Sequence, residues 1–333
     1  MRDGFIKVAA GTPRIRVADC HYNAEQIFTM MREADQQGVR VLCLPELCLT
    51  GYTCGDLFLQ DTLLRGAEEG LNTILEATRN LDLVTAVGLP VRDKWDGKLY
   101  NCAAVVCKGQ LLGLVPKTYL PNYGEFYEKR WFSGRRVENR TVEMADGSET
   151  LFGNSILLEM TDPNQQEEHV TFGMEICEDL WTPEPPSIRH ALNGANVIVN
   201  LSASDETTGK DIYREELVGG QSARLLCGYI YASAGDGEST QDVVYSAHNI
   251  IAENGRILKK AKRFANETVY SEIDVLRLNA ERRRMTTFET RMDGYTEIPF
   301  ALKIEETELT RYIDPMPFVP GSKTDRERRC DEI

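Results

Sequence analysis

The chain lacks the residue patterns that usually hold structural metals. Only four histidines occur in 333 residues, and none of the nine cysteines belongs to a CxxC pair. We therefore do not expect a zinc site. The cysteines are odd in number and lie mostly within apolar runs, which predicts buried, reduced thiols rather than disulfides, as in a cytoplasmic protein.

Long hydrophobic runs and basic tracts are also missing. No apolar run approaches the ~20 residues of a membrane-spanning helix, and residues 1–11 resemble a short strand rather than a signal peptide. Acidic residues outnumber basic ones by 52 to 38, which gives a formal net charge of −14. Without a Lys/Arg stripe, nucleic acid is not an expected partner. These patterns predict a cytoplasmic protein with neither membrane nor nucleic-acid partners.

What the chain does contain is an alternation of strand-like and helix-like segments. Short apolar runs predict strands, and apolar residues at three- to four-residue spacing predict helices. Strands are expected at 5–10, 39–44, 83–91, 100–106, 111–115, 155–160, 170–177, 196–201, 229–234, 247–252, 257–261 and 269–273, and helices at 24–34, 63–75, 185–193 and 211–227. Hairpins mixed with crossover helices predict an α/β protein with a mixed sheet or two packed sheets.

The pattern weakens after about Arg284. Three prolines between 315 and 320 interrupt any regular element, and residues 322–333 are almost wholly charged or polar. We therefore predict a domain over residues 1–284 and a C-terminal arm or linker over residues 285–333.

A carboxylate, an amine and a thiol each follow an apolar strand. Glu46 follows the run ending at Pro45, Lys117 follows Pro116, and Cys177 follows Ile176. Strand ends are where α/β folds usually place catalytic groups. Each residue alone is more often structural, as a turn residue or a small buried thiol. The three together indicate a nucleophilic site.

The residues around these three positions resemble the nitrilase, or carbon–nitrogen hydrolase, superfamily. Its three motifs are matched in order by Pro45-Glu46-Leu47 with Thr50-Gly51-Tyr52, by Pro116-Lys117-Thr118-Tyr119-Leu120-Pro121, and by Ile176-Cys177-Glu178-Asp179 with Trp181. Further segments resemble the amidase domain of glutamine-dependent NAD synthetases: Asp56-Leu57-Phe58, residues 119–128 and residues 200–204. The resemblance implies a four-layer αββα sandwich and hydrolysis of glutamine to glutamate and ammonia.

The chemistry of such a site follows from the residue types. A thiol has a reference pKa near 8.5, so little thiolate is present at neutral pH without help. Glu46 is predicted to be the general base for Cys177 and to pass the proton to the departing ammonia. Lys117 is predicted to hold the oxyanion, helped by the backbone N–H of Glu178. The intermediate is a thioester, which water then hydrolyses.

The resemblance also implies the remaining site residues. Glu128 matches the family's second glutamate, which orders Lys117 and the water, whereas nearby Glu125 is the weaker candidate. The positions that match glutamine-binding residues are Tyr123, Glu178, Ser204 and Lys210. Lys210 departs from the family, because arginine often stands there and grips a carboxylate with two parallel hydrogen bonds. A solvated loop lysine is the alternative interpretation of Lys210.

The resemblance further implies partners that this chain does not hold itself. The family carries a synthetase domain whose Ser-Gly-Gly loop binds ATP for the amidation of deamido-NAD, and no such loop occurs here. We therefore expect no metal or cofactor in this chain, glutamine as substrate, a homo-oligomer, and a synthetase domain in the full-length enzyme. Two alternatives stay open: a free-standing amidase for another small amide, and a non-catalytic assembly domain.

Overall fold

The structure is a computed structural model, and it describes residues 4–134, 137–144, 146–162, 165–238, 242–303, 307–315 and 319–332. Its α-helices are α1 (Cys20–Gln36), α2 (Asp61–Ala77), α3 (Pro186–Leu192), α4 (Lys210–Leu225), α5 (Val275–Arg284) and α6 (Lys323–Glu332). The described residues also form the short 3-10 helices η2 (Tyr52–Leu59), η3 (Glu128–Arg130) and η4 (Cys177–Trp181).

The strands form two sheets. The first sheet has the order β14-β1-β2-β3-β4-β5-β7-β6 and the second β13-β12-β11-β10-β9-β8-β15. The strands of the first are β1 (Phe5–Ala10), β2 (Val41–Cys43), β3 (Val84–Arg92), β4 (Leu99–Cys107), β5 (Gln110–Pro116), β6 (Arg140–Glu143), β7 (Glu149–Phe152) and β14 (Val269–Asp274). Those of the second are β8 (Ile156–Asp162), β9 (Gln165–Ile176), β10 (Val197–Ser202), β11 (Gly228–Ser233), β12 (Ile250–Glu253), β13 (Arg256–Lys260) and β15 (Thr296–Ala301).

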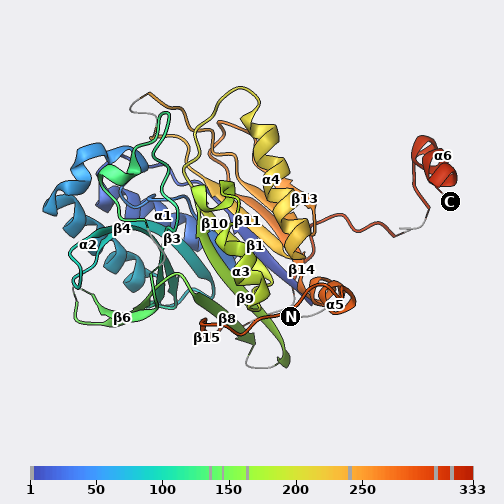
Figure 1. Ribbon diagram of the computed structural model, residues 1–333, viewed down its shortest axis with the longest axis horizontal. Coiled ribbons are helices and arrows are strands. Elements are labelled where there is room, and N and C mark those ends of the chain that lie inside the picture. Colours follow the sequence, from blue (N-terminus) through green and yellow to red (C-terminus); the bar gives the residue numbers. More distant parts are fainter. Residues whose placement is uncertain are drawn as a thin grey trace.

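The two sheets pack face to face, with helices on both outer faces. Alternate residues of strands from both sheets, such as Val105 and Phe172, form one buried cluster between the sheets. The opposite residues of the first sheet pack under α1 and α2, and those of the second sheet pack under α3 and α4. Figure 1 shows the two helix pairs on opposite sides of the sheets. The predicted four-layer αββα sandwich is therefore confirmed.

Local sequence signals explain several element boundaries. Lys108 and Gly109 both have positive φ and connect β4 to β5 as the predicted hairpin turn. Proline begins α3, and Gly194 (φ 116°) follows its end. Asp19 caps α1 by accepting a hydrogen bond from the N–H of Tyr22.

Part of the predicted C-terminal arm belongs to the sandwich. Strand β15 pairs in parallel with β8 at the edge of the second sheet. Its sequence is only weakly typical of a strand, because Phe300 is its one buried residue. Pro299 weakens the strand pattern further, since proline cannot donate a ladder hydrogen bond and is tolerated only at a sheet edge. Farther on, the Arg311 guanidinium donates to both carboxylate oxygens of Glu253, at 2.7 and 3.0 Å. The ordered body thus extends past residue 284.

The last described segment is helical rather than irregular. Helix α6 has no buried residue, and it lies apart from the sandwich in Figure 1.

The cysteines are all free thiols, and eight of the nine are buried, with Cys330 exposed. Within the described ranges, every helix is too short or too polar to cross a membrane.

Candidate active site

The three predicted catalytic residues come from both sheets. Glu46 lies three residues after β2, and Lys117 directly follows β5, so both belong to the first sheet. Cys177 directly follows β9 of the second sheet and begins η4. A Cβ atom at Gly88 of β3 would lie 2.5 Å from the carbonyl oxygen of Pro45. Glycine at that position therefore lets the Glu46 segment pack closely on β3.

A buried lysine joins two carboxylates at the centre of the site. The Nζ of Lys117 lies 2.6 Å from Oε1 of Glu46 and 2.7 Å from Oε1 of Glu128. The three side chains are at most 2% exposed. Two anions and one cation removed from water are stabilised mainly by one another, so their geometry is tightly determined.

Burial and charge act in opposite directions on this group. Burial disfavours the charged Lys117, but the Glu128 and Glu46 carboxylates outweigh it and raise the lysine pKa well above its usual value. Burial raises the pKa of Glu128 to about 7, although the adjacent Lys117 ammonium opposes the shift. Lys117 therefore stays a cation at neutral pH, and Glu128 titrates near neutrality.

Cys177 is held in an unusual backbone conformation beside this cluster. Its φ is 44°, in the left-handed region that non-glycine residues rarely adopt. Its N–H donates to Oδ1 of Asn200, at 3.2 Å, which fixes the turn. Strained residues of this kind cluster at active sites, where surrounding contacts maintain them.

The resting thiol of Cys177 is protonated. Burial and then the Glu46 carboxylate raise its pKa, and the Lys117 ammonium lowers it only in part. The site therefore needs a base that removes the proton as the sulfur attacks. Glu46 is the carboxylate whose charge acts most strongly on the thiol.

Two residues that the sequence analysis did not assign fix the Glu46 carboxylate. The side-chain amide of Asn101 donates to its Oε1 at 2.6 Å, and the N–H of Ala203 donates to Oε2 at 3.0 Å. Asn101 is a lone polar residue within the apolar β4 sequence, and that pattern could have indicated a role in the site. Ala203 contributes only its backbone N–H, so its residue type could not have indicated the contact.

Tyr52 is a further unassigned residue. Its hydroxyl donates to Oε1 of Glu128 at 2.8 Å, the same oxygen that accepts from Lys117. Tyr52 belongs to the Thr50-Gly51-Tyr52 segment of the first motif, so the sequence marked its position without indicating its contact.

Asp179 links the lysine loop to the cysteine turn. Its carboxylate accepts hydrogen bonds from the N–H groups of Tyr119, at 2.9 Å, Thr118, at 3.2 Å, and Ile176, at 2.9 Å. Burial raises its pKa to about 8, although the backbone donors favour the carboxylate. Asp179 thus ties the residues that follow Lys117 to the residue that precedes Cys177.

Two of the predicted glutamine-binding residues contact each other. The Tyr123 hydroxyl donates to Oε1 of Glu178 at 2.8 Å. Glu178 immediately follows Cys177, and Tyr123 is 61% exposed, so the pair lies between the buried thiol and the surface. Burial raises the pKa of Glu178, and the charges of Lys117 and Lys210 oppose the shift.

The other two, Ser204 and Lys210, have separate partners. The ammonium of Lys210 forms an ion pair with Asp205 and lies 5.3 Å from the ring centroid of Trp181. Lys210 is therefore held in place rather than solvated, against the alternative interpretation. Ser204 is buried and accepts from Nη2 of Arg214 at 3.3 Å. Arg214 is fully buried one helical turn after Lys210, and the sequence analysis missed it.

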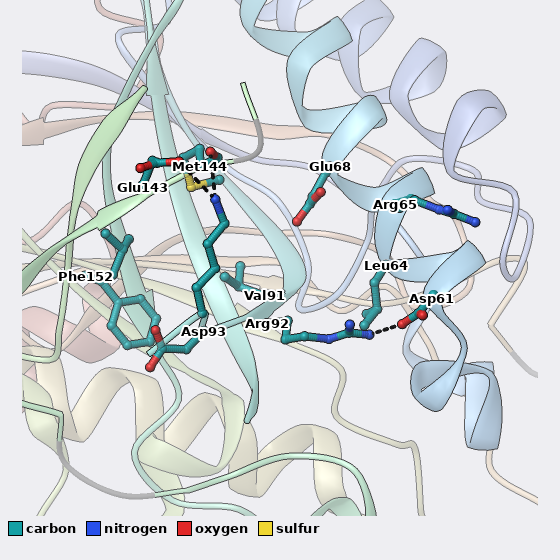
Figure 2. Close-up of a pocket in the computed structure, with 12 residues that line it drawn as sticks. Asp61, Leu64, Arg65, Glu68, Val91, Arg92, Asp93, Glu143, Met144 and Phe152 are labelled. Carbon is teal, nitrogen blue, oxygen red and sulfur yellow. Dashed lines mark hydrogen bonds and ion pairs between the residues drawn. The ribbon is translucent and has the colours of Figure 1, made fainter. Parts of the chain in front are cut away.

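A separate pocket of about 330 Å³ lies between α2, the end of β3 and the β6–β7 hairpin. Figure 2 shows the Arg92 side chain reaching Asp61 of α2 across this pocket. None of the residues that line it belongs to the Glu46–Lys117–Cys177 cluster. The catalytic roles of that cluster stay predictions, but Glu46, Lys117 and Cys177 are all buried, and the charges of the first two act on the thiol of the third.

Comparisons with known proteins show the family of the chain. The family model "Carbon-nitrogen hydrolase" matches residues 7–283. The chain is 36% identical over 340 residues to the glutamine-dependent NAD(+) synthetase of Mycobacterium tuberculosis, covering 99% of this chain and 49% of that protein. It is 30% identical to that of Aquifex aeolicus, over 84% of this chain and 44% of that protein. The chain thus spans about half the length of the curated relatives it matches.

Solved structures show the same fold. A crystal structure of a glutamine-dependent NAD(+) synthetase from Cytophaga hutchinsonii matches with a TM-score of 0.70 and 32% identity, over 81% of this chain and 43% of that one. The nitrilase-superfamily protein Nit3 of Saccharomyces cerevisiae matches with a TM-score of 0.65 and 18% identity, over 85% and 95% of the two chains. With a family model that covers most of its length, the chain belongs to the carbon–nitrogen hydrolase family.

Proposed function

We propose that this chain hydrolyses the side-chain amide of glutamine through a thioester on Cys177. The observation that carries the proposal is the buried contact of Lys117 with Glu46 and Glu128, at 2.6 and 2.7 Å, beside a buried thiol. The NAD(+) synthetases to which the chain is similar are glutamine-dependent by name.

In the first half-reaction, the Cys177 sulfur attacks the amide carbon while its proton passes to Glu46. The tetrahedral oxyanion is held by the Lys117 ammonium and the N–H of Glu178. The carbon–nitrogen bond then breaks as Glu46 returns the proton to the departing nitrogen, and ammonia leaves. The glutamyl group remains as a thioester.

In the second half-reaction, Glu46 takes a proton from water, which attacks the thioester carbon. Collapse of the second oxyanion breaks the carbon–sulfur bond and releases glutamate, and Glu46 returns its proton to the sulfur, which restores the thiol. The Oε2 atom of Glu128 has no hydrogen-bond partner in the described parts of the chain, so it can accept from that water. Lys117 serves both steps because its charge is maintained at neutral pH.

Recognition of free glutamine requires an anion for its ammonium and a cation for its carboxylate. We assign the ammonium to Glu178, oriented by Tyr123, and the carboxylate to Lys210, whose position Asp205 and Trp181 fix. Ser204 contributes a hydroxyl that Arg214 orients. A lysine offers a point charge rather than a two-pronged contact, so the carboxylate is held less rigidly than by arginine.

We further propose that the ammonia serves the ATP-dependent amidation of deamido-NAD by a synthetase domain, which the relatives' greater length leaves room for. ATP and deamido-NAD would bind to that synthetase domain and not to the residues described above.

Eight buried free thiols support the reducing cytoplasm as the compartment. Exposed Ile212 and Tyr213 on α4 offer a surface for a homo-oligomer, which light scattering can test.

The decisive experiment measures ammonia release from glutamine, asparagine and propionamide. We expect glutamine to be preferred, because only a ligand with its own ammonium and carboxylate can pair with both Glu178 and Lys210. Cys177→Ala should abolish turnover, whereas Cys107→Ala, which alters another buried cysteine at a strand end, should retain it. Equal rates on propionamide would favour a general amidase, and turnover by the Cys177→Ala variant would refute the thioester.

A further inference from the structure

Glu238 is a buried carboxylate outside the three motifs that binds the start of η2. Its Oε1 accepts from the N–H of Tyr52 at 2.7 Å, and its Oε2 accepts from the N–H and the hydroxyl of Thr53, both at 3.1 Å. The Glu238 backbone carbonyl accepts from the same hydroxyl at 2.8 Å. Glu238 is 2% exposed, so these contacts replace its hydration.

This carboxylate supplies a cap that η2 lacks. The residue before the helix is Gly51, which has no side chain to accept hydrogen bonds from the first N–H groups. Glu238 takes that place from 185 residues farther along the sequence. Backbone N–H groups at the start of such a segment have no partner within it, so a carboxylate that accepts from them satisfies them. The direction of the Tyr52 side chain therefore depends on Glu238.

The Glu238 segment is itself fixed against the body of the protein. Gly237 has a φ of 100°, and a Cβ atom there would lie 2.2 Å from the carbonyl oxygen of Ile15. The approach is so close that only glycine fits. The backbone directly before Glu238 therefore packs closely against Ile15.

Tyr52 continues the connection to the reacting groups. Its hydroxyl donates to Oε1 of Glu128, and the Lys117 ammonium donates to the same oxygen. The hydroxyl of Tyr52 and the ammonium of Lys117 together therefore fix the position of Oε1 of Glu128. Since Lys117 is to hold the oxyanion, a shift of Glu128 would move the cation away from the developing charge.

We propose that Glu238 is a positioning residue for the hydrolysis: it fixes Tyr52, which holds Glu128 and through it Lys117 in the reactive arrangement. The inference rests on the proposed function for the identity of the reaction. No described hydrogen bond joins Glu238 directly to Lys117, Glu46 or Cys177, and the hydrogen-bonded route from Glu238 to Lys117 runs through Tyr52 and Glu128.

The test is a double-mutant cycle of Glu238→Gln with Tyr52→Phe, with ammonia release from glutamine as the readout. The amide of glutamine presents a donor to one of the η2 N–H groups, so the cap is lost on one side. We expect each single variant to lower kcat ~10-fold with KM changed less than ~2-fold, the pattern of an interaction lost in the transition state. In the Tyr52→Phe background, Glu238→Gln should change kcat less than ~2-fold, because the connection is already broken.

Two further variants separate positioning from stability. Thr53→Val removes the hydroxyl that donates to Glu238 but keeps the carboxylate, and we expect a ~3-fold loss of kcat that again vanishes with Tyr52→Phe. This variant carries the test if Glu238→Gln does not fold. Glu272→Gln is the matched control, since Glu272 is also buried and accepts from a hydroxyl and an N–H, of Thr310 and Arg311. It should lower stability without lowering kcat.

A substrate-independent readout distinguishes this proposal from the proposed function. The rate at which iodoacetamide alkylates Cys177, followed by peptide mass spectrometry, reports the surroundings of the thiol even if glutamine is not hydrolysed. Wild-type protein without glutaminase activity would refute the proposed function alone. Additive effects of Glu238→Gln and Tyr52→Phe on kcat or on the alkylation rate, or an equal loss in Glu272→Gln, would overturn the positioning role.

Discussion

Replacing Asp179 by asparagine should separate the two strand ends that form the site. The carboxylate accepts three backbone hydrogen bonds, two from the residues after Lys117 and one from Ile176. An asparagine can keep its oxygen toward Thr118 and Tyr119. Its NH₂ group then faces the N–H of Ile176, and neither group can accept.

The magnitude follows from the contact that is lost. A buried N–H left without an acceptor costs ~1–3 kcal/mol. Asp179 is 1% exposed, so water does not replace the carboxylate. We expect the free energy of unfolding to fall by ~2 kcal/mol, measured as a shift of the guanidinium midpoint at unchanged slope.

Turnover should fall more than stability alone explains. Ile176 directly precedes Cys177, so relaxation of its N–H alters the left-handed turn that presents the sulfur. Displacement of a reacting group by ~1 Å can cost ~100-fold. We expect kcat for glutamine to fall between ~10- and ~100-fold, with KM changed less than ~2-fold.

Asp93→Asn is the matched control. Asp93 is also buried, accepts from the N–H of Trp95 at 3.1 Å, pairs with Arg140, and lines the separate pocket of Figure 2. This variant should lose stability and keep kcat. A kcat for Asp179→Asn within ~2-fold of wild type, or an equal loss in Asp93→Asn, would refute the role given to Asp179.

Three further outcomes follow from the same geometry. Lys117→Ala should lower kcat at least ~100-fold in the ammonia assay, the usual effect of losing an oxyanion donor; a loss below ~10-fold would contradict its role. Burial raises the pKa of Glu128 to about 7. Between about pH 4.5 and pH 7, the folded protein therefore keeps a proton on Glu128 that the unfolded chain has released. The free energy of unfolding should fall as the pH rises through this range. Glu128→Gln should flatten that slope in denaturation curves recorded across the window, and an unchanged slope would place the titration elsewhere. Lys210→Ala should raise KM for glutamine more than it lowers kcat, because the ammonium binds the unreactive end of the substrate; a pure kcat effect would show a different role.

The sequence by itself determined most of the sandwich and the identity of its reacting groups. Apolar runs predict strands because a strand buried between layers must be apolar on both faces, and the run from Tyr100 to Val106 becomes the central part of β4. Glu46, Lys117 and Cys177 could be singled out because a carboxylate, an amine and a thiol each follow an apolar strand and match the motifs of one family in order, although each alone is more often structural. By contrast, β15 escaped prediction, since an edge strand buries little and so imposes little on its sequence.

Only the tertiary structure decided which groups meet. Glu46 and Lys117 belong to one sheet and Cys177 to the other, and the contacts that hold them come from Asn101, Ala203 and Tyr52, far apart in sequence. Such contacts leave no local pattern, because a backbone N–H or a single hydroxyl can be supplied by any segment that the fold brings close. Glu238, 185 residues from the helix that it caps, is the clearest case. Sequence specifies the chemistry through residue type, whereas the packing of two sheets specifies distance and burial, and these set the charges of the site.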